Sequence, residues 1–376
     1  MADNIRLVDV TKRFGEVTAV NRLNLEIKQG ECFSFLGPSG CGKTTTLRML
    51  AGFEDLDEGE MYVGDTLVSS SIKKYYLPPE KRGFGMVFQA FAVWPHMSVY
   101  ENVAFPLRVK RMSREDVDRR TREALINTRL NGLERNFPGE LSGGQQQRIA
   151  LARAIALNPR VLLLDEPLSN LDPHNRESMR FEIKDLQRKL GVTIVFVTHD
   201  QSEAMALSDR MLVMKEGVVQ QVDTPVNIYY NPANRFVFSF IGLSNFIPVE
   251  VEDGKVYVEG AKGAGHLALA SEVASDALKG GKAVAAFRPS DIVFEEDGRV
   301  SGKVIRRTFL GEQVDYRIKV GEHELRMQRY RQGAYLKEGD AVRLGFKRIL
   351  WYEKAPLMIS RKVRGGRTAA APSLPF

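Results

Sequence analysis

The sequence predicts an α/β fold around a mostly parallel sheet, with a mainly α-helical subdomain inserted into it and a small all-β domain after it. Apolar, β-branched runs alternate with helical patterns over residues 1–242, which is typical of βαβ units. No strand pattern occurs between about residues 90 and 156, and glycine-separated alternating patterns begin near residue 243. We therefore expect domains at 1–242 and 243–355, followed by a basic, disordered tail at 356–376.

The composition fits this organisation. The chain has 376 residues, of which 43% are hydrophobic and 27% charged, enough for two domains. No apolar run approaches the roughly 18 to 20 residues that cross a bilayer, and the start lacks signal-peptide features, so we expect a soluble, cytoplasmic protein. Five of the seven net positive charges lie after Glu353, which leaves +2 elsewhere and argues against nucleic acid as a partner.

The βαβ pattern can be followed along the chain. Cys32–Leu36 is an expected buried strand, and a glycine loop and a helix beginning near Lys43 follow it. Val161–Leu164 and Val192–Thr198 have the apolar character of parallel strands. A helix is predicted over Glu177–Leu190 between them. Its apolar residues at helical spacing are Met179, Phe181, Ile183, Leu186 and Leu190.

Two further segments carry helical patterns in the inserted region. Arg114–Leu130 is rich in charge and periodic, and Gln145–Leu157 is rich in alanine and ends at Asn158-Pro159. We therefore expect a mainly helical subdomain that is inserted before the strand at Val161.

Short strands with period-two alternation dominate the last region. Apolar residues alternate with charged ones from Val314 to Val320, Gly321-Glu322 forms a turn, and alternation resumes near Leu325 and over Val342–Phe346. Short strands joined by glycine turns predict a small β-barrel of the OB type.

A complete phosphate-binding pattern, G-x-x-x-x-G-K-[ST], begins at Gly37. Its glycines allow backbone amides to surround phosphate groups, Lys43 reaches the β- and γ-phosphates of ATP, and the Thr44 hydroxyl is placed to ligate Mg²⁺. The helix that follows directs its positive dipole end at the nucleotide. The predicted ATP-binding residues here are Gly37, Pro38, Ser39, Gly40, Cys41, Gly42, Lys43, Thr44 and Thr45.

The two cysteines of the chain, Cys32 and Cys41, do not indicate a disulfide framework. Cys41 has two open interpretations. It is either a reactive thiol, because the neighbouring Lys43 lowers a thiol pKa, or a small residue that fits a tight loop.

Polar residues stand at the ends of the predicted strands. Asp165 follows Val161–Leu164 and is the candidate for the Mg²⁺ shell, and the next residue, Glu166, is the candidate for polarising the attacking water. Gln89 follows the apolar run Met86–Phe88, where an amide can both ligate the metal and orient water. His199 ends another strand and is placed to donate a hydrogen bond to the γ-phosphate.

A second anion-binding pattern is Leu141-Ser142-Gly143-Gly144-Gln145, at the start of a predicted helix. One chain already has its own phosphate loop, so this second site requires a second ATP. We expect that ATP to be held by a second subunit, bound head to tail, with these residues contacting it in trans.

Over residues 4–242 these motifs resemble the ATPases of ATP-binding cassette (ABC) transporters. The resemblance implies that Gly37–Thr44 is a Walker A loop, that Asp165 is the Walker B carboxylate and that Glu166 is the catalytic base. It also implies a Q-loop at Gln89, a switch histidine at His199, and a D-loop over Ser169–Asp172 in which Asp172 contacts ATP in trans.

Phe14 occupies the position at which such ATPases place an aromatic ring on adenine. Tyrosine or tryptophan is commoner there, so a core phenylalanine is the alternative interpretation.

Two segments resemble the importers for sugars, polyamines and ferric iron. Phe91–Met97 is similar to the segment that helps form a groove for a permease helix, and Phe287–Ile292 is similar to part of a TOBE-type domain. The resemblance implies a second ATPase subunit, two transmembrane permease domains, an extracytoplasmic solute-binding protein, and a place on the cytoplasmic face of the membrane. Mg²⁺ is the implied cofactor and ATP the substrate.

Other classes of protein share the composite site. A DNA-repair or chromosome ATPase carries long heptad repeats between the two halves of the site, and the sequence has none. A ribosome-binding translation factor usually has two cassettes in one chain, whereas one signature occurs here. An exporter or a regulatory ATPase is a nearer alternative, and the expected C-terminal domain argues against the exporter.

Overall fold

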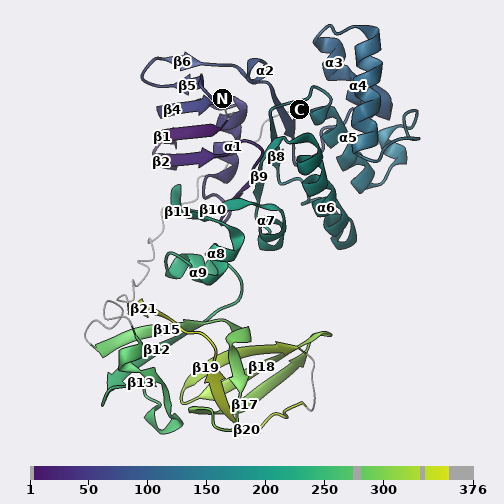
Figure 1. Cartoon of the computed structure of the whole chain (residues 1–376). Coiled ribbons are helices and arrows are strands. Elements are labelled where there is room, and N and C mark those ends of the chain that lie inside the picture. Colours follow the sequence, from purple (N-terminus) through teal and green to yellow (C-terminus); the bar gives the residue numbers. More distant parts are fainter. Residues whose placement is uncertain (1–3, 274–280, 331–334, 355–376) are drawn as a thin grey trace, which may run out of the picture. The chain divides into compact units, whose positions relative to one another are not determined.

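The computed structural model describes residues 4–273, 281–330 and 335–354. The chain divides into two compact units, Met1–Gly242 and Leu243–Phe376. The tail that the sequence suggested at 356–376 lies outside the described residues. Figure 1 shows the elements of each unit.

The middle layer of the first unit is a six-stranded sheet of order β11-β10-β3-β9-β8-β7. All neighbouring strands in it run parallel except β11, which pairs antiparallel with β10, so the sheet is mostly parallel as predicted. Its strands are β3 (Cys32–Leu36), β7 (Phe84–Val87), β8 (Val161–Asp165), β9 (Thr193–Thr198), β10 (Arg210–Lys215) and β11 (Val218–Asp223).

Both faces of this sheet are covered, which explains its continuous apolar runs. Leu163 and Val195 pack into one core with Leu7 and Met61 of a second sheet. Side chains that alternate with them along the same strands, such as Leu162, join another core on the helical side. The sheet therefore holds its carboxyl-end residues on a rigid base between two cores.

The second sheet of this unit is antiparallel, with the order β2-β1-β4-β5-β6, and the sequence analysis did not predict it. Its strands are half exposed, and polar residues interrupt the apolar ones in β1, whose pairing with β2 has three register shifts between Leu7 and Arg13. The bounds are β1 (Ile5–Phe14), β2 (Val17–Ile27), β4 (Glu58–Val63), β5 (Thr66–Ser70) and β6 (Tyr75–Tyr76).

Three helices between β7 and β8 form the inserted subdomain, and they stand together in Figure 1. Their apolar sides meet at Val103, Leu125 and Ile149 in the core that also contains Leu162 of the sheet. A serine caps the start of each helix. The segment comprises α3 (Val99–Val109), α4 (Arg114–Asn127), the 3₁₀ turn η1 (Pro138–Glu140) and α5 (Gly143–Ile155).

The first unit also contains helices outside the inserted subdomain. In α6, Met179, Ile183 and Leu186 are buried as predicted, but Phe181 is 67% exposed, which corrects its assignment to the apolar face. Phe181 lies two residues from Met179, about 200° around the helix. The bounds are α1 (Lys43–Ala51), α2 (Pro79–Arg82), α6 (Pro173–Leu190), α7 (Gln201–Leu207), α8 (Pro225–Tyr230) and α9 (Arg235–Phe240).

The second unit is all-β around one core, in agreement with the predicted barrel-like domain. Its two five-stranded antiparallel sheets have the orders β14-β13-β12-β15-β21 and β16-β20-β17-β18-β19. The first contains β12 (Asn245–Glu252), β13 (Lys255–Val258), β14 (His266–Leu269), β15 (Lys282–Phe287) and β21 (Leu350–Glu353). The second contains β16 (Ile292–Phe294), β17 (Val300–Phe309), β18 (Gln313–Val320), β19 (His323–Tyr330) and β20 (Ala341–Phe346).

The predicted fold class is confirmed: an α/β unit with a mostly parallel sheet and a helical insertion, and a β-barrel-like unit. Among the helices of the described residues, none combines the length and the apolar character that a membrane crossing requires.

Candidate functional site

The predicted phosphate loop connects the end of β3 to the start of α1. Gly42 precedes the helix with a left-handed φ of 104°, and a Cβ there would overlap the Ala19 carbonyl oxygen. Only glycine fits this position without strain. Gly42, the residue before α1, has no side chain that could cap the helix. The amide groups of the first turn therefore donate to no capping side chain. The helix start is therefore suited to an anion.

Lys43 is 6% exposed, and its ammonium lies over the loop. The Nζ donates to the carbonyl oxygens of Gly37 at 2.8 Å and Pro38 at 2.9 Å. Cys41 Sγ lies 3.7 Å from the same Nζ, yet burial raises the pKa of this thiol more than Lys43 lowers it. The geometry thus favours the interpretation of Cys41 as a small residue in a tight loop over that of a reactive thiolate.

Asp165 is the last residue of β8 and lies beside the phosphate loop, because the Thr44 side chain hydrogen-bonds to its carboxylate. Burial raises the pKa of Asp165, and the adjacent Glu166 raises it further. A buried carboxylate next to a second acid is stabilised by a nearby cation. The Thr44 hydroxyl and the Asp165 carboxylate are oxygen donors of the kind that Mg²⁺ binds, so the residues present fit this metal.

Gln89 and His199 meet at the Glu166 carboxylate. Gln89 Nε2 donates to Glu166 Oε2 at 3.1 Å, and His199 Nδ1 lies 3.2 Å from the same oxygen. Glu166 has a left-handed φ of 45°, which is strained for a residue with a side chain, and its amide donates to the Val197 carbonyl at 3.0 Å. Gln89, Glu166 and His199 each follow a different strand of the sheet. The fold thus brings them together at one edge of the sheet, as the sequence suggested.

The Leu141–Gln145 motif lies at the start of α5 and is capped by its own side chains. Ser142 Oγ accepts from the Gln145 amide at 3.4 Å, and Gln145 Oε1 accepts from the Ser142 amide at 2.9 Å. A Cβ on Gly143 would approach only Leu171, and one on Gly144 only Asn175. The motif therefore lies beside the segment that contains Asp172, which caps α6 by accepting from the Asn175 amide.

Phe14 ends β1 and is 49% exposed, so the alternative of a core phenylalanine is not supported. Lys12 Nζ lies 5.3 Å from the centre of its ring. An exposed aromatic face is available for stacking on a base.

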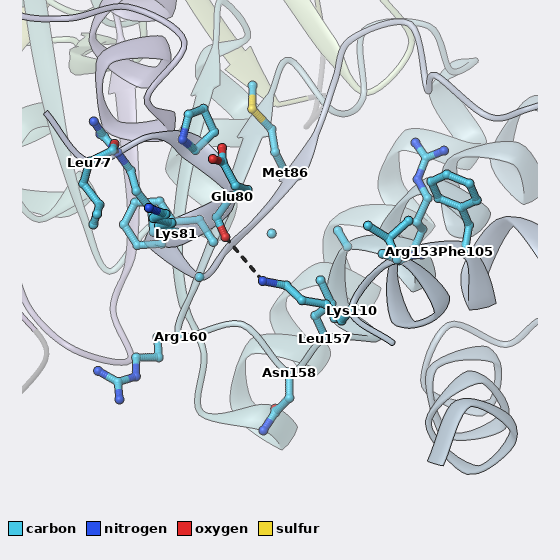
Figure 2. A pocket seen from close by; sticks show the side chains of 18 of the residues that line it. Leu77, Glu80, Lys81, Met86, Phe105, Lys110, Arg153, Leu157, Asn158 and Arg160 are labelled. Atoms are coloured by element: carbon cyan, nitrogen blue, oxygen red, sulfur yellow. Dashed lines mark hydrogen bonds between the residues drawn. The ribbon is translucent and has the colours of Figure 1, made fainter. Parts of the chain in front are cut away.

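A cavity of about 1010 Å³ opens between the β7 region and the inserted helices. Trp94 packs against Phe105, with 4.5 Å between the ring centres, and the Arg153 guanidinium lies 4.5 Å from the centre of the Trp94 ring. Figure 2 shows Phe105 and Arg153 among the lining side chains, and Lys110 reaching the Glu80 carbonyl at 3.4 Å. The predicted Phe91–Met97 segment thus contributes to a built cavity.

Comparison with known proteins identifies the family. Residues 20–169 match the ABC transporter family, and residues 285–349 match the TOBE domain family. The spermidine/putrescine import ATP-binding protein PotA of Rubrobacter xylanophilus is 46% identical over 350 residues, which is 90% of each chain. The chain belongs to the ABC transporter ATP-binding subunits. ATP binding and hydrolysis are the activity of this family.

Two further relatives have different names. The trehalose/maltose import ATP-binding protein MalK of Thermococcus litoralis is 54% identical over 255 residues, or 67% of this chain and 68% of that protein. An Fe(3+) ions import ATP-binding protein of Rhizobium meliloti is 43% identical over 314 residues, or 83% of this chain and 86% of that protein.

Solved structures agree with the assignment. A dimeric ATP-binding cassette in a post-hydrolysis state with ADP and Pi is 35% identical, with a TM-score of 0.51, over 59% of this chain and 98% of that one. The CbiO1 protein of Clostridium perfringens is 28% identical, with a TM-score of 0.55, over 60% of this chain and 89% of that one.

Two sets of contacts near the site were not predicted from the sequence, one made by Asn170 and one by Arg176. Asn170 Nδ2 donates to the Gln89 carbonyl at 2.7 Å, which ties the Ser169–Asp172 segment to the segment after β7. Arg176 donates to the carbonyl oxygens of Leu171 and Ser169, both at 2.8 Å. The Ser169–Asp172 motif could be recognised in the sequence. Its residue types do not indicate which main-chain carbonyl groups accept hydrogen bonds from Asn170 and Arg176.

Proposed function

We propose that this chain is the ATP-hydrolysing motor subunit of a binding-protein-dependent importer, and that its transported solute is a polyamine, ferric iron or a sugar. The convergence of Gln89 and His199 on Glu166, beside a phosphate loop, carries the proposal of hydrolysis. The names of the relatives above support the direction of transport and the three solute classes.

Nucleotide binding within one chain uses the phosphate loop and Phe14. Lys43 exchanges its hydrogen bonds to Gly37 and Pro38 for bonds to the phosphates, and the amides of the loop and of the first turn of α1 surround them. Phe14 stacks on the adenine. Thr44, Gln89 and Asp165 are the residues that would hold Mg²⁺, which supplies charge neutralisation on the phosphates.

Glu166 is the proposed general base for the attacking water. Its carboxylate is oriented by the Gln89 amide and by His199, which share one of its oxygens. The other oxygen is left to accept a proton from water, while His199 also lies at the carboxyl end of β9, where it can contact the γ-phosphate. Removing the base blocks proton abstraction without removing the phosphate-binding groups.

Completion of the site requires a second subunit. The Leu141–Gln145 motif lies next to Leu171 and Asn175, which are neighbours of Asp172 in the chain or hydrogen-bonded to it. The motif and Asp172 therefore form one surface that a partner's nucleotide contacts. Two chains in head-to-tail arrangement then enclose two ATP molecules. ATP binding favours this closed dimer and hydrolysis reopens it.

The cavity around Trp94 is the proposed seat of the permease. Its lining combines apolar side chains with the basic side chains of Lys81, Lys110 and Arg153, which suits one amphipathic helix of a membrane domain. The two cavities of a dimer would then take one helix from each of two membrane domains. The subunit then lies at the cytoplasmic face of the membrane, and the permease receives solute from an extracytoplasmic binding protein.

Glu166→Gln is the experiment that tests this mechanism. We expect the variant to bind ATP with nearly unchanged affinity, to lose at least about 10²-fold in hydrolysis rate, and to accumulate as an ATP-dependent dimer in size-exclusion chromatography. Glu216→Gln is the matched control, because Glu216 also has a left-handed backbone, with a φ of 50°, in an exposed turn. Normal turnover by Glu166→Gln would exclude Glu166 as the base.

A further inference from the structure

Arg82 holds the C-terminal end of the helix that follows the phosphate loop. It is the last residue of α2 and only 7% exposed. Its Nη1 donates to the carbonyl oxygens of Met49 at 2.7 Å and Leu50 at 2.8 Å, both in the last turn of α1. Its Nε donates to the Leu77 carbonyl at 2.7 Å, and Nη2 to that of Val68 at 3.4 Å.

The buried guanidinium donates hydrogen bonds to main-chain carbonyl groups of three separate segments: α1, β5 and the segment that contains Leu77. The last carbonyl groups of a helix have no partner within the helix, and a cation there also interacts favourably with the helix dipole. Burial lowers the pKa of Arg82, because removing the guanidinium charge from water costs free energy. All four acceptors given above are carbonyl groups, whose positions are fixed by the fold.

The surroundings of Arg82 are shaped to hold its guanidinium. Gly52, just after α1, has a left-handed φ of 84°, and a Cβ on it would lie 2.7 Å from Arg82 Nε. The Tyr76 ring lies 5.3 Å from the guanidinium carbon, and the Tyr76 hydroxyl donates to the Gly52 carbonyl. A side chain at position 52 would therefore displace the arginine.

The same end of α1 is also attached beyond the far end of β7. The Phe53 ring lies 5.9 Å from the ring of Phe88, the residue that precedes Gln89. Arg82 lies before β7 and Phe88 lies after it, so one short strand carries both attachments. Because α1 is a nine-residue helix, a displacement of its C-terminal end also displaces Lys43 and Thr44 at its start.

Arg82 and Phe88 are in addition lining residues of the cavity that contains Trp94. The attachment of α1 is thus part of the cavity wall. A shift of this wall would act on the phosphate loop through α1, by a route separate from the Gln89 carboxamide.

We propose that Arg82 is a positioning residue that couples α1, and with it Lys43 and Thr44, to the wall of the Trp94 cavity. This inference rests on the proposed function, because it assumes that nucleotide binds at the phosphate loop.

Trp94 provides a direct readout of this coupling. The chain has two tryptophans, so Trp351→Phe leaves Trp94 as the sole tryptophan reporter inside the cavity. In this parent we expect saturating ATP to shift the Trp94 emission. Adding Arg82→Gln should abolish the shift although ATP still binds, as checked by calorimetry. Arg82→Lys keeps a charge but cannot bridge the same four carbonyl groups, so we expect it to retain part of the shift.

Kinetics separate positioning from stability. We expect Arg82→Gln to lower kcat about tenfold per folded molecule, because a small misplacement of reacting groups is costly, with an intermediate value for Arg82→Lys. The control is Arg210→Gln. Arg210 donates to the Glu26 carbonyl at 3.3 Å and pairs in register with Phe33, near the start of β3 and away from the phosphate loop. Its loss should lower the melting temperature without changing kcat or the Trp94 shift.

The outcomes are distinct. Loss of the Trp94 shift in Arg82→Gln but not in Arg210→Gln supports the proposal. An unchanged shift in Arg82→Gln, the absence of a shift in the parent, or equal kinetic effects in the two variants overturns it. If Arg82→Gln does not fold, a shift and kcat in Arg82→Lys equal to those of the parent also overturn it. A parent that neither binds nor hydrolyses ATP contradicts the proposed function instead.

Discussion

The starts of α1 and α5 are both glycine-containing helix N-termini, but they are satisfied in different ways. At α1 no side chain caps the first turn, and the buried Lys43 adds a positive charge to it. At α5 the Ser142 and Gln145 side chains form a complete capping box, in an exposed position. One helix start depends on an outside anion, whereas the other is already satisfied by its own residues.

This difference suggests a division of roles between the two motifs. In the proposed site, the α1 start would bind phosphate strongly within one chain, because no capping side chain must be displaced from the amides of its first turn. In the proposed dimer, the α5 site would bind phosphate only when a partner's ATP competes with the Ser142–Gln145 bonds, each of which contributes on the order of 1 kcal/mol. Such a weak, replaceable cap suits a contact that must form and break in every cycle.

Lys43→Ala should break the stronger site and give the largest effect. We expect the affinity of a single chain for ATP to fall at least about 10²-fold, because hydrogen bonds between charged groups contribute about 1.5–3 kcal/mol each. Calorimetric titration with ATP measures it, and Lys28→Ala, which changes an exposed lysine, is the control. Nearly unchanged binding by Lys43→Ala would contradict the assignment of the phosphate site to α1.

Ser142→Ala should act on the second site alone. We expect single-chain ATP affinity to stay within about twofold, kcat to fall about tenfold or more, and helix stability to fall by about 1 kcal/mol from the lost cap. Binding titrations, steady-state hydrolysis and thermal melting separate these three effects. A loss of ATP affinity in the single chain would place Ser142 in the same site as Lys43.

Mixing the two variants sharpens the contrast. A mixed dimer of Lys43→Ala and Ser142→Ala chains contains one site with an intact phosphate loop from one chain and an intact Ser142 from the other. If the sites are shared across a dimer, the mixture hydrolyses ATP faster than either variant alone. No gain on mixing would mean that each chain uses its own Ser142.

The parts of the site that could be predicted from sequence are those set by strand ends. Asp165, Glu166 and His199 follow continuous apolar runs, and parallel strands of one sheet bring their carboxyl ends to one edge. The order of the runs therefore predicts that these residues lie near Lys43. Their roles in hydrolysis remain predictions.

Other features depend on tertiary contacts that no local pattern encodes. The shared oxygen of Glu166 could not be predicted, because it depends on the left-handed backbone at that residue. The antiparallel β2-β1-β4-β5-β6 sheet was missed because its half-exposed strands carry polar residues and bulges. Arg82 follows two prolines in a charged stretch of the sequence, a context that does not indicate burial. Its buried position depends on hydrogen bonds to carbonyl groups more than 30 positions away in sequence.

A third helix start, that of α7, gives the smallest expected effect. Asp200 caps it by accepting from the amides of Ser202 at 2.7 Å and Glu203 at 3.1 Å. Glu203 does not complete a capping box. It is 3% exposed and accepts a hydrogen bond from the Thr198 hydroxyl at 2.6 Å. Burial raises the pKa of Glu203 above its ordinary value of 4.5, with a further contribution from Asp200, although Thr198 opposes the shift.

The sign of the resulting pH dependence can be tested with Glu203→Gln. Below about pH 4.5 the carboxyl is protonated in both states, so its ionisation contributes nothing. As the pH rises, the unfolded chain loses this proton first, which lowers the free energy of unfolding of the wild type until the pH passes the raised folded pKa. The stability of Glu203→Gln relative to wild type should therefore increase with pH through that window and then level off. Denaturant unfolding at several pH values measures it, with Glu177→Gln as an exposed control, and a difference that stays constant or decreases as the pH rises would show that the buried carboxyl is not the group responsible.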